Sequence, residues 1–258
     1  MALASDDAVA AALHALRQDP ARSAILVDFD GTLAPIVEDP EAAVPLPGIV
    51  DALDALRSRF GVVAVVSGRP VSYLQRHLSG DLVLVGLYGL ERVRDRRLEL
   101  HPEVAGWRSV VAEVVEAARR ELPDGVGVED KGLSLTLHVR PRPDLAEIAQ
   151  QWATAAAVRS GLHVRRARMS AELHPPVAAD KGTVTAELIA GLAAACFVGD
   201  DVGDLPAFAA LDAFAAEGRV AVRVVVTSNE ATPELLASAD ALLDGPPAVL
   251  EFLTALQS

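Results

Sequence analysis

Lysine is almost absent from this chain. Only Lys131 and Lys181 occur among 23 basic residues, so arginine supplies the other 23 − 2 = 21. Both lysines stand in the same tripeptide, Asp-Lys-Gly. A compact ammonium and a planar guanidinium fork suit different sites. The two lysines therefore indicate positions where the shape of the cation matters.

Cysteine and aromatic residues are also scarce. The single cysteine, Cys196, excludes an internal disulfide, and its apolar neighbours predict a small core residue. Aromatic residues make up 4% of the chain against 51% hydrophobic residues in total. The core is therefore expected to consist of many small alanine and valine contacts.

The chain also lacks the signals of a membrane or secreted protein. Its N-terminus carries Asp6 and Asp7 where a signal peptide has basic residues, and the longest apolar stretch, 188–199, is too short to span a bilayer. These features favour a cytoplasmic setting. The net charge of −13 makes nucleic acid and membrane surfaces poor partners. A small phosphorylated ligand remains compatible where a local site or a metal ion supplies positive charge.

Continuous apolar runs alternate with amphipathic segments at both ends of the chain. Such runs are typical of strands buried on both faces. Strands are expected at 24–27, 62–66, 82–85, 195–198, 220–226 and 241–243, with helices at 7–17, 49–60 and 247–256. This alternation predicts an α/β fold built on a doubly wound parallel sheet.

The middle of the chain follows another pattern. Residues 133–140 and 162–168 alternate polar with apolar, as strands with one wet face do, and 103–121 and 144–159 read as helices. In the first of these strands, even positions 134–140 are polar and odd positions 133–139 apolar. We expect a core of residues 1–100 and 175–258, interrupted by an inserted α+β cap of residues 101–174.

Polar residues collect where the buried strands end. Asp28 and Asp30 follow the first strand, Ser67 the second, and Asp200 with Asp201 a later one. Ligands in open α/β sheets bind beyond the carboxyl ends of strands. Clustered carboxylates repel one another unless a cation is present, and oxygen ligands suit Mg²⁺. The sequence therefore predicts a Mg²⁺ site, which favours a phosphate as the other ligand. The alternative is that these aspartates cap the helices that follow the strands.

Four segments, in order, resemble the motifs of the haloacid dehalogenase-like superfamily of phosphotransferases. They are Asp28-Phe-Asp-Gly-Thr-Leu, Ser67 in Val-Val-Ser-Gly-Arg, Lys181, and Gly199-Asp-Asp-Val-Gly-Asp204. The match spans roughly residues 24–98 and 174–245. It implies a Rossmannoid parallel-sheet core with an inserted cap of the C2 type.

The resemblance also implies roles for residues at these positions. Asp28 is the expected nucleophile, forming an aspartyl-phosphate, and Asp30 the general acid and base. Ser67 is expected to bind a phosphoryl oxygen and Lys181 to stabilise the transition state. Arg69 is expected to bind substrate together with Asp28 and Asp30. The implied metal ligands are Asp28, Asp30 through its backbone carbonyl, Asp200 and Asp204.

The middle segment is similar to trehalose-6-phosphate phosphatases. The similar stretches are Val128–Arg140, Gly86-Leu-Tyr-Gly-Leu-Glu91 and Ala171-Glu-Leu-His-Pro-Pro176. The resemblance implies that Glu129, Lys131 and Glu172 bind sugar hydroxyls when the cap closes. His138 is expected to join them, although a solvated strand face is an equal alternative for His138 and Arg140.

The resemblance implies hydrolysis of trehalose 6-phosphate to trehalose and phosphate, as part of trehalose biosynthesis with functional coupling to a trehalose-6-phosphate synthase. A phosphatase for sucrose phosphate or mannosyl-3-phosphoglycerate is the nearest alternative, followed by a phosphosugar mutase and a non-catalytic sensor. The chain departs from the usual pattern at Gly203, Leu205 and Tyr88, where Thr, Glu and His are common. Asp200 and Asp204 are kept, so the departures bear on sugar preference more than on the metal site.

Overall fold

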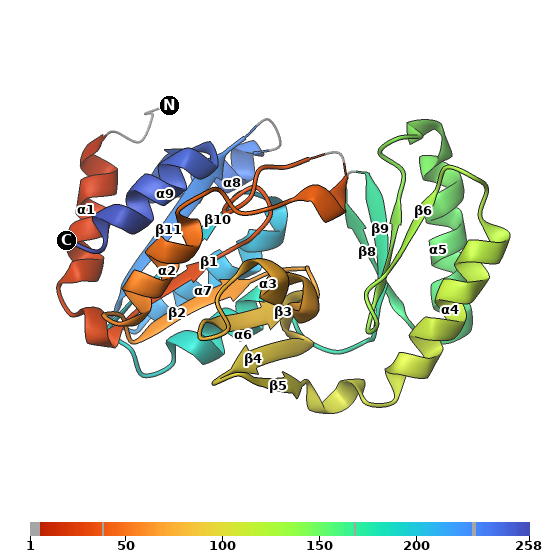
Figure 1. The fold of residues 1–258 in the computed structure, drawn as a ribbon, viewed down its shortest axis with the longest axis horizontal. Helices are drawn as coiled ribbons and strands as arrows, with labels where there is room; N and C mark the ends of the chain where they lie inside the picture. Colours follow the sequence, from red (N-terminus) through yellow and green to blue (C-terminus); the bar gives the residue numbers. More distant parts are fainter. Residues whose placement is uncertain (1–5, 38, 168, 229–230) are drawn as a thin grey trace. The chain divides into compact units, whose positions relative to one another are not determined.

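The computed structural model describes residues 6–37, 39–167, 169–228 and 231–258 (Figure 1). Contacts divide the chain into two compact units. The larger unit contains Met1–Glu99 and Ala179–Ser258, and the smaller contains Leu100–Ala178. Within the described residues, no helix is long and apolar enough to cross a membrane.

An eight-stranded sheet forms the centre of the larger unit, in the order β12-β11-β10-β1-β2-β3-β4-β5. Neighbours from β12 to β3 are parallel, which confirms the predicted α/β sheet, whereas β3 and β4 pair antiparallel. The strands are β1 (Ser23–Val27), β2 (Val62–Val66), β3 (Val83–Gly86), β4 (Glu91–Arg94), β5 (Arg97–Leu100), β10 (Ala194–Gly199), β11 (Val220–Thr227) and β12 (Ala241–Asp244).

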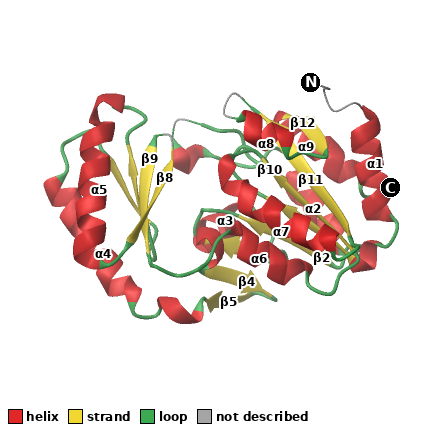
Figure 2. Cartoon of the chain, turned by 180° about the vertical axis from the view of Figure 1, so that it is seen from behind, coloured by secondary structure: helices red, strands yellow, loops and turns green. Residues whose placement is uncertain are grey.

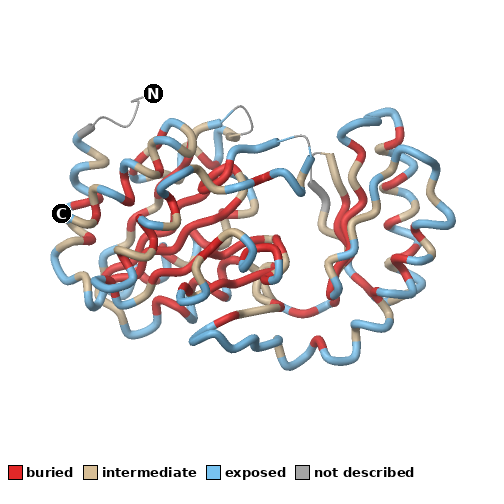
Figure 3. The backbone as a smooth tube through the Cα atoms, in the orientation of Figure 1, coloured by how far each residue is buried: buried red, intermediate tan, exposed pale blue. Residues whose placement is uncertain are grey.

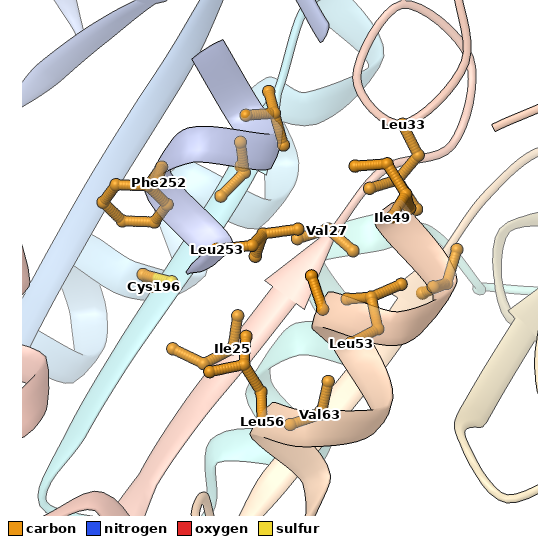
Figure 4. Close-up of a cluster of buried hydrophobic side chains, with 14 of the residues drawn as sticks. Ile25, Val27, Leu33, Ile49, Leu53, Leu56, Val63, Cys196, Phe252 and Leu253 are labelled. Atoms are coloured by element: carbon orange, nitrogen blue, oxygen red, sulfur yellow. The ribbon is translucent and has the colours of Figure 1, made fainter. Parts of the chain in front are cut away.

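Helices cover both faces of this sheet, and strand residues alternate between the two layers. Ile25 and Val27 of β1 pack with α2 and α9 (Figure 4), whereas Leu26 belongs to a second buried cluster with α6 and α7. Both faces of β1 are fully buried, so its sequence is a continuous apolar run. The helices are α1 (Asp6–Arg17), α2 (Ile49–Arg57), α3 (Val71–His77), α6 (Lys181–Ile189), α7 (Leu205–Ala216), α8 (Pro233–Ala237) and α9 (Gly245–Ala255).

Cys196 lies in the core, as predicted. Its side chain is fully buried on β10, close to Phe252 and Leu253 in the first cluster (Figure 4). Burial raises the pKa of its thiol to about 12, so the reactive thiolate is suppressed.

An antiparallel sheet, in the order β6-β7-β9-β8, forms the smaller unit with helices on one side of it (Figure 2). Its strands are β6 (Gly127–Asp130), β7 (Leu135–His138), β8 (His163–Ala167) and β9 (Ser170–His174), and its helices are α4 (Trp107–Glu121) and α5 (Ala146–Ser160). Odd-numbered residues of β7 pack against both helices. The predicted alternation is therefore confirmed, but β7 is shorter than 133–140, and Arg168 at the end of the other predicted strand lies outside the described residues.

The remaining regular structure consists of short 3₁₀ turns at Pro20–Arg22, Pro40–Ala42, Leu87–Gly89, Pro102–Val104, Pro143–Leu145 and Val202–Asp204. Burial is greatest along the central strands of each sheet (Figure 3). Polar residues buried to the same extent are therefore unusual, and several of those in the larger unit lie at or directly after the carboxyl ends of its strands.

Candidate active site

Three neighbouring strands bring polar side chains to one edge of the large sheet. Asp28 follows β1, Ser67 follows β2 and Asp200 follows β10. Because β1 lies between β2 and β10 and runs parallel to both, the carboxyl ends of all three strands meet at this edge. Asp28 is 5%, Ser67 1% and Asp200 3% exposed. The sequence prediction placed all three at this edge.

Lys181 supplies the positive charge of the site. It is the first residue of α6, whose N-terminus is held by a capping box between Asp180 and Thr183. Its Nζ lies 2.9 Å from Asp28 Oδ1 and 2.6 Å from Asp204 Oδ1, and the residue is only 3% exposed. Burial alone would lower the pKa of Lys181, but Asp204 and Asp28 raise it well above its usual value. Lys181 is therefore a charged ammonium between two carboxylates.

Asp204 holds the loop after β10 together. One of its oxygens accepts the Lys181 ammonium, and the other accepts the backbone N–H groups of Asp200 and Asp201, at 3.0 and 3.2 Å. Asp204 is fully buried. Both of its oxygens thus accept hydrogen bonds, which fits a residue that holds Lys181 and the loop after β10 in position.

Oxygen atoms of Asp28, Asp200 and Asp204 lie within 4.8 Å of one another, in a group that could hold a metal ion. Burial raises the pKa of Asp28 well above its usual value, and Lys181 only partly opposes this. Burial also raises the pKa of Asp200 to about 9, with the charge of Asp28 adding to it. A divalent cation would offset the burial of these carboxylates and the repulsion between them, and would favour their ionised forms. The oxygen donors therefore fit a hard metal ion.

Gly31 allows Asp200 to approach the first motif. Its φ is 73°, in the left-handed region, and a Cβ placed on it would lie 1.9 Å from Asp200 Oδ2. Any side chain here would push the carboxylate out of the cluster. The glycine of the first motif thus serves both the turn and the cation site.

Asp30 makes a different contact from Asp28. Arg69 donates to both of its carboxylate oxygens, from Nε at 2.8 Å and from Nη2 at 2.7 Å. Its backbone carbonyl, not its carboxylate, was the predicted metal ligand. The predicted substrate role of Arg69 stays a prediction, and the structure adds an ion pair with Asp30 that the sequence did not indicate.

Tyr88, which the sequence marked only as a departure from the family pattern, has contacts at the site that the sequence did not indicate. Leu87 and Tyr88 have φ of 50° and 58°, an uncommon conformation for non-glycine residues. Their N–H groups donate to the carbonyls of Arg69 and Ser67. A Cβ on Gly68 would lie 2.6 Å from the Tyr88 hydroxyl, so the phenol covers the loop that carries Ser67. The glycines on either side of Leu87 and Tyr88 were the only sign in the sequence of a tight turn here.

The smaller unit has a polar cluster of its own. Across its sheet, Glu129, Thr136, Glu172 and Arg165 are paired in register in one row. Glu172 accepts hydrogen bonds from Ser134 Oγ at 2.7 Å and Arg165 Nη1 at 3.2 Å. The sheet thus brings three of the predicted sugar-binding positions to one region of the smaller unit, since Lys131 also lies there.

Lys131 and a fourth predicted residue, His138, form ion pairs in this cluster. The Nζ of Lys131 lies 3.8 Å from Glu172 Oε1, and His138 Nε2 lies 2.7 Å from Glu129 Oε2. The Thr136 hydroxyl is buried without a hydrogen-bond partner among the residues that the structure describes. Ser134 and Thr136 on this face are buried, at 1% and 4% exposed, and His138 is half-buried, whereas Arg140 is exposed as the solvated alternative expected.

Comparison with known proteins agrees with this arrangement. The trehalose-phosphatase family model matches residues 26–240. A trehalose-phosphate phosphatase of Mycobacterium ulcerans is 33% identical over 253 residues, which cover 92% of this chain and 62% of that protein. A probable trehalose-phosphate phosphatase of Sinorhizobium fredii is 33% identical over 202 residues, covering 74% of this chain and 75% of that protein.

A solved structure shows the same fold. The C-terminal domain of trehalose-6-phosphate phosphatase from C. albicans superposes with a TM-score of 0.77 at 23% identity, covering 96% of each chain. The present chain spans about three fifths of the mycobacterial relative, as the 62% coverage states. The family model matches most of the chain, at positions that include the whole buried carboxylate cluster. The chain therefore belongs to the trehalose-phosphatase family.

Proposed function

We propose that this chain is a Mg²⁺-dependent phosphatase that hydrolyses trehalose 6-phosphate to trehalose and phosphate through an aspartyl-phosphate. The observation that carries the proposal is the position of Asp28, which is buried 2.9 Å from the Lys181 ammonium and has a carboxylate oxygen within 4.8 Å of one of Asp200. A nucleophilic carboxylate in such a site faces a cation on one side and a metal-binding group on the other. The names of the relatives support trehalose 6-phosphate as the substrate.

In the first half of the reaction, an Asp28 carboxylate oxygen attacks phosphorus. The bond between phosphorus and the sugar oxygen breaks as Asp30 gives that oxygen a proton. Lys181, held by Asp204, stabilises negative charge on the phosphoryl group. The Ser67 hydroxyl donates a hydrogen bond to a phosphoryl oxygen.

In the second half, Asp30 removes a proton from water. The water oxygen bonds to phosphorus, and the bond from phosphorus to Asp28 breaks. Phosphate leaves, and Asp28 is again a carboxylate. Asp30 is again protonated for the next cycle, so protons and bonds balance over the two halves.

Mg²⁺ is the proposed cation, which Asp28, Asp200 and the Asp30 backbone carbonyl would hold. Asp204, also predicted as a ligand, accepts Lys181 and two backbone N–H groups and would support the site through them. A hard cation bound by oxygen atoms neutralises charge on a phosphoryl group. Trehalose 6-phosphate comes from a synthase reaction, so we propose functional coupling to a trehalose-6-phosphate synthase.

Phosphate release from a panel of sugar phosphates tests the substrate. With Mg²⁺, kcat/KM for trehalose 6-phosphate should exceed that for glucose 6-phosphate by about tenfold or more, because a site built to bind hydroxyls rejects ligands that lack them. EDTA should abolish phosphate release. Equal rates on both sugars would remove trehalose 6-phosphate as the substrate. Sucrose phosphate and mannosyl-3-phosphoglycerate complete the panel, and an isomerised sugar without free phosphate would indicate a mutase.

We further propose that Glu129, Lys131, His138 and Glu172 of the smaller unit bind the sugar. Lys131 is the most informative of them, because its side chain is only 10% exposed beside Glu172. In this crowded position, an arginine could not place its guanidinium where the ammonium lies. Ligand hydroxyls would compete with Glu172 for the same donors.

A Lys131→Arg variant should raise KM for trehalose 6-phosphate roughly tenfold, which is about 1.4 kcal/mol of binding. Its KM for p-nitrophenyl phosphate, which has no sugar, should stay unchanged. Arg119→Lys is the control, because it makes the reverse exchange at an exposed position of α4 and should leave both KM values unchanged. Equal KM changes for both substrates would take Lys131 out of sugar recognition.

A further inference from the structure

The Asp30 carboxylate is clamped rather than free. Arg69 meets it with two parallel N–H···O bonds, at 2.8 and 2.7 Å, and the Arg69 residue itself is only 8% exposed. A bidentate pair fixes the orientation of a carboxylate as well as its distance. Since Asp30 is the proposed acid and base, whatever holds its side chain also sets where its proton is given and taken.

Arg69 is itself fixed by Tyr73. The guanidinium carbon of Arg69 lies 4.4 Å from the centroid of the Tyr73 ring, a cation–π geometry. Tyr73 is 3% exposed, and its hydroxyl donates to the carbonyl of Ala43 at 2.5 Å. The ring is thus anchored through α3 at one end and through the segment after the first motif at the other.

The same ring also contacts the backbone segment of the catalytic aspartates. Phe29, which stands between Asp28 and Asp30, packs edge-on against Tyr73 with centroids 5.8 Å apart. Tyr73 therefore supports Asp30 twice, through Arg69 at the carboxylate and through Phe29 at the main chain.

We propose that Arg69, held on the Tyr73 ring, is a positioning residue that keeps the Asp30 carboxylate in place to accept a proton from the attacking water. This inference rests on the proposed function. A carboxylate with one lone pair of each oxygen bound by Arg69 keeps other lone pairs for the water proton. The water oxygen then bonds to phosphorus and the bond to Asp28 breaks. Without the two hydrogen bonds from Arg69, the Asp30 carboxylate rotates away from the attacking water, and the aspartyl-phosphate is hydrolysed more slowly.

This role differs in its kinetics from direct substrate binding, which the sequence suggested for Arg69. Loss of a substrate contact raises KM. Loss of the base of the second half lowers kcat, and because the aspartyl-phosphate then accumulates, it lowers KM as well instead of raising it. It also changes which half of the cycle is slow, because the second half depends on water activation whatever the leaving group is. The amount of aspartyl-phosphate at steady state reports that change directly.

The test compares Arg69→Gln with Arg76→Gln. Arg76 also stacks on Tyr73, at 4.8 Å, but pairs with Glu41 on the surface and is 57% exposed at its side chain. For R69Q, kcat should fall by roughly 10²-fold, since general acid–base catalysis contributes about 10²–10⁴-fold, and KM should fall with it and not rise. R76Q should stay within about twofold of the wild type.

Rapid quenching with p-nitrophenyl phosphate supplies the second readout. This substrate has a good leaving group, so the first half needs little help from an acid. R69Q should accumulate aspartyl-phosphate at steady state, and R76Q should resemble the wild type. An increase in KM at unchanged kcat, or a loss of kcat without accumulated aspartyl-phosphate, would overturn the positioning role.

Two further measurements distinguish a failure of this inference from a failure of the proposed function. Absence of turnover in the wild type with Mg²⁺ would refute the proposed function itself. If R69Q does not fold, two variants of Tyr73 test the positioning role instead. Tyr73→Phe keeps the ring and should lose less kcat than Tyr73→Leu, which removes the stacking surface under Arg69. Equal losses in the two Tyr73 variants would contradict the role of the ring.

Discussion

An Asp28→Asn variant should lose turnover by on the order of 10⁴-fold or more and still bind trehalose 6-phosphate, because an amide keeps the shape of the carboxylate but cannot attack phosphorus. Steady-state phosphate release measures the first part, and titration calorimetry with substrate measures the second. Phosphorylation of the variant by acetyl phosphate should be undetectable. Turnover that persists would remove Asp28 as the nucleophile.

The fold should tolerate this change. Burial raises the pKa of Asp28 and Lys181 only partly opposes this, so an ionised Asp28 is costly in the folded chain without a metal ion, and a neutral amide suits the same place. The unfolding temperature in EDTA should therefore stay within about 5 °C of the wild type. Asp212→Asn, at an exposed aspartate of α7 paired with Arg223, is the control for the same substitution away from the site. A D28N chain that does not fold would leave its lost turnover without mechanistic meaning, and the calorimetry detects that case.

How far the sequence predicted the fold depended on burial. The apolar run 62–66 coincides with β2, because a central strand buried on both faces leaves a continuous hydrophobic pattern. Helix α7 was not predicted, although it lies directly after the Asp204 motif. Its sequence, Leu205–Ala216, is apolar almost throughout, so no 3.6-residue period marks a helix there. Strands β6 and β9 were missed because four or five residues carry too little pattern.

At the site, the sequence predicted which residues belong to it better than which of them contact one another. Strand ends placed Asp28, Ser67 and Asp200 together, since the carboxyl ends of parallel strands meet at one edge of the sheet. The pairing of Arg69 with Asp30 could not be foreseen, because an arginine gives no sign of which acid it will meet across a sheet. The left-handed turn at Tyr88 is likewise set by tertiary contacts with Ser67 and Arg69.

Replacing Lys181 by methionine is the second substitution with a large expected effect. The change leaves Asp28 and Asp204 without the ammonium that lies 2.9 and 2.6 Å from them. Removing one partner of a buried ion pair costs about 3–5 kcal/mol, and loss of a transition-state cation costs on the order of 10²–10³ in kcat. Urea unfolding and phosphate release measure the two losses. A K181M chain as stable and active as the wild type would contradict both roles.

The stability loss should depend on pH. Lys181 lowers the pKa of Asp28 and of Asp204, which burial raises above the usual 3.8, so both values rise further without it. A carboxylate with a raised folded pKa makes the folded chain bind more protons than the unfolded chain between 3.8 and the folded value. Stability therefore falls as pH rises through that window. K181M should lose more stability at pH 8 than at pH 5, and a loss that is equal at both would contradict this account.

The double variant Lys181→Met, Asp204→Asn separates the structural role of Lys181 from its catalytic role. An asparagine at 204 removes one of the two stranded charges, and its amide oxygen can still accept the N–H groups of Asp200 and Asp201. The double variant should therefore unfold at higher urea than K181M and lose less stability at pH 8. Its kcat should stay as low as that of K181M, because no cation stands beside the phosphoryl group. Recovered turnover would mean that the ammonium serves the fold alone. Recovered stability without turnover is the result expected if this lysine, like Lys131, is kept for the chemistry of a compact cation.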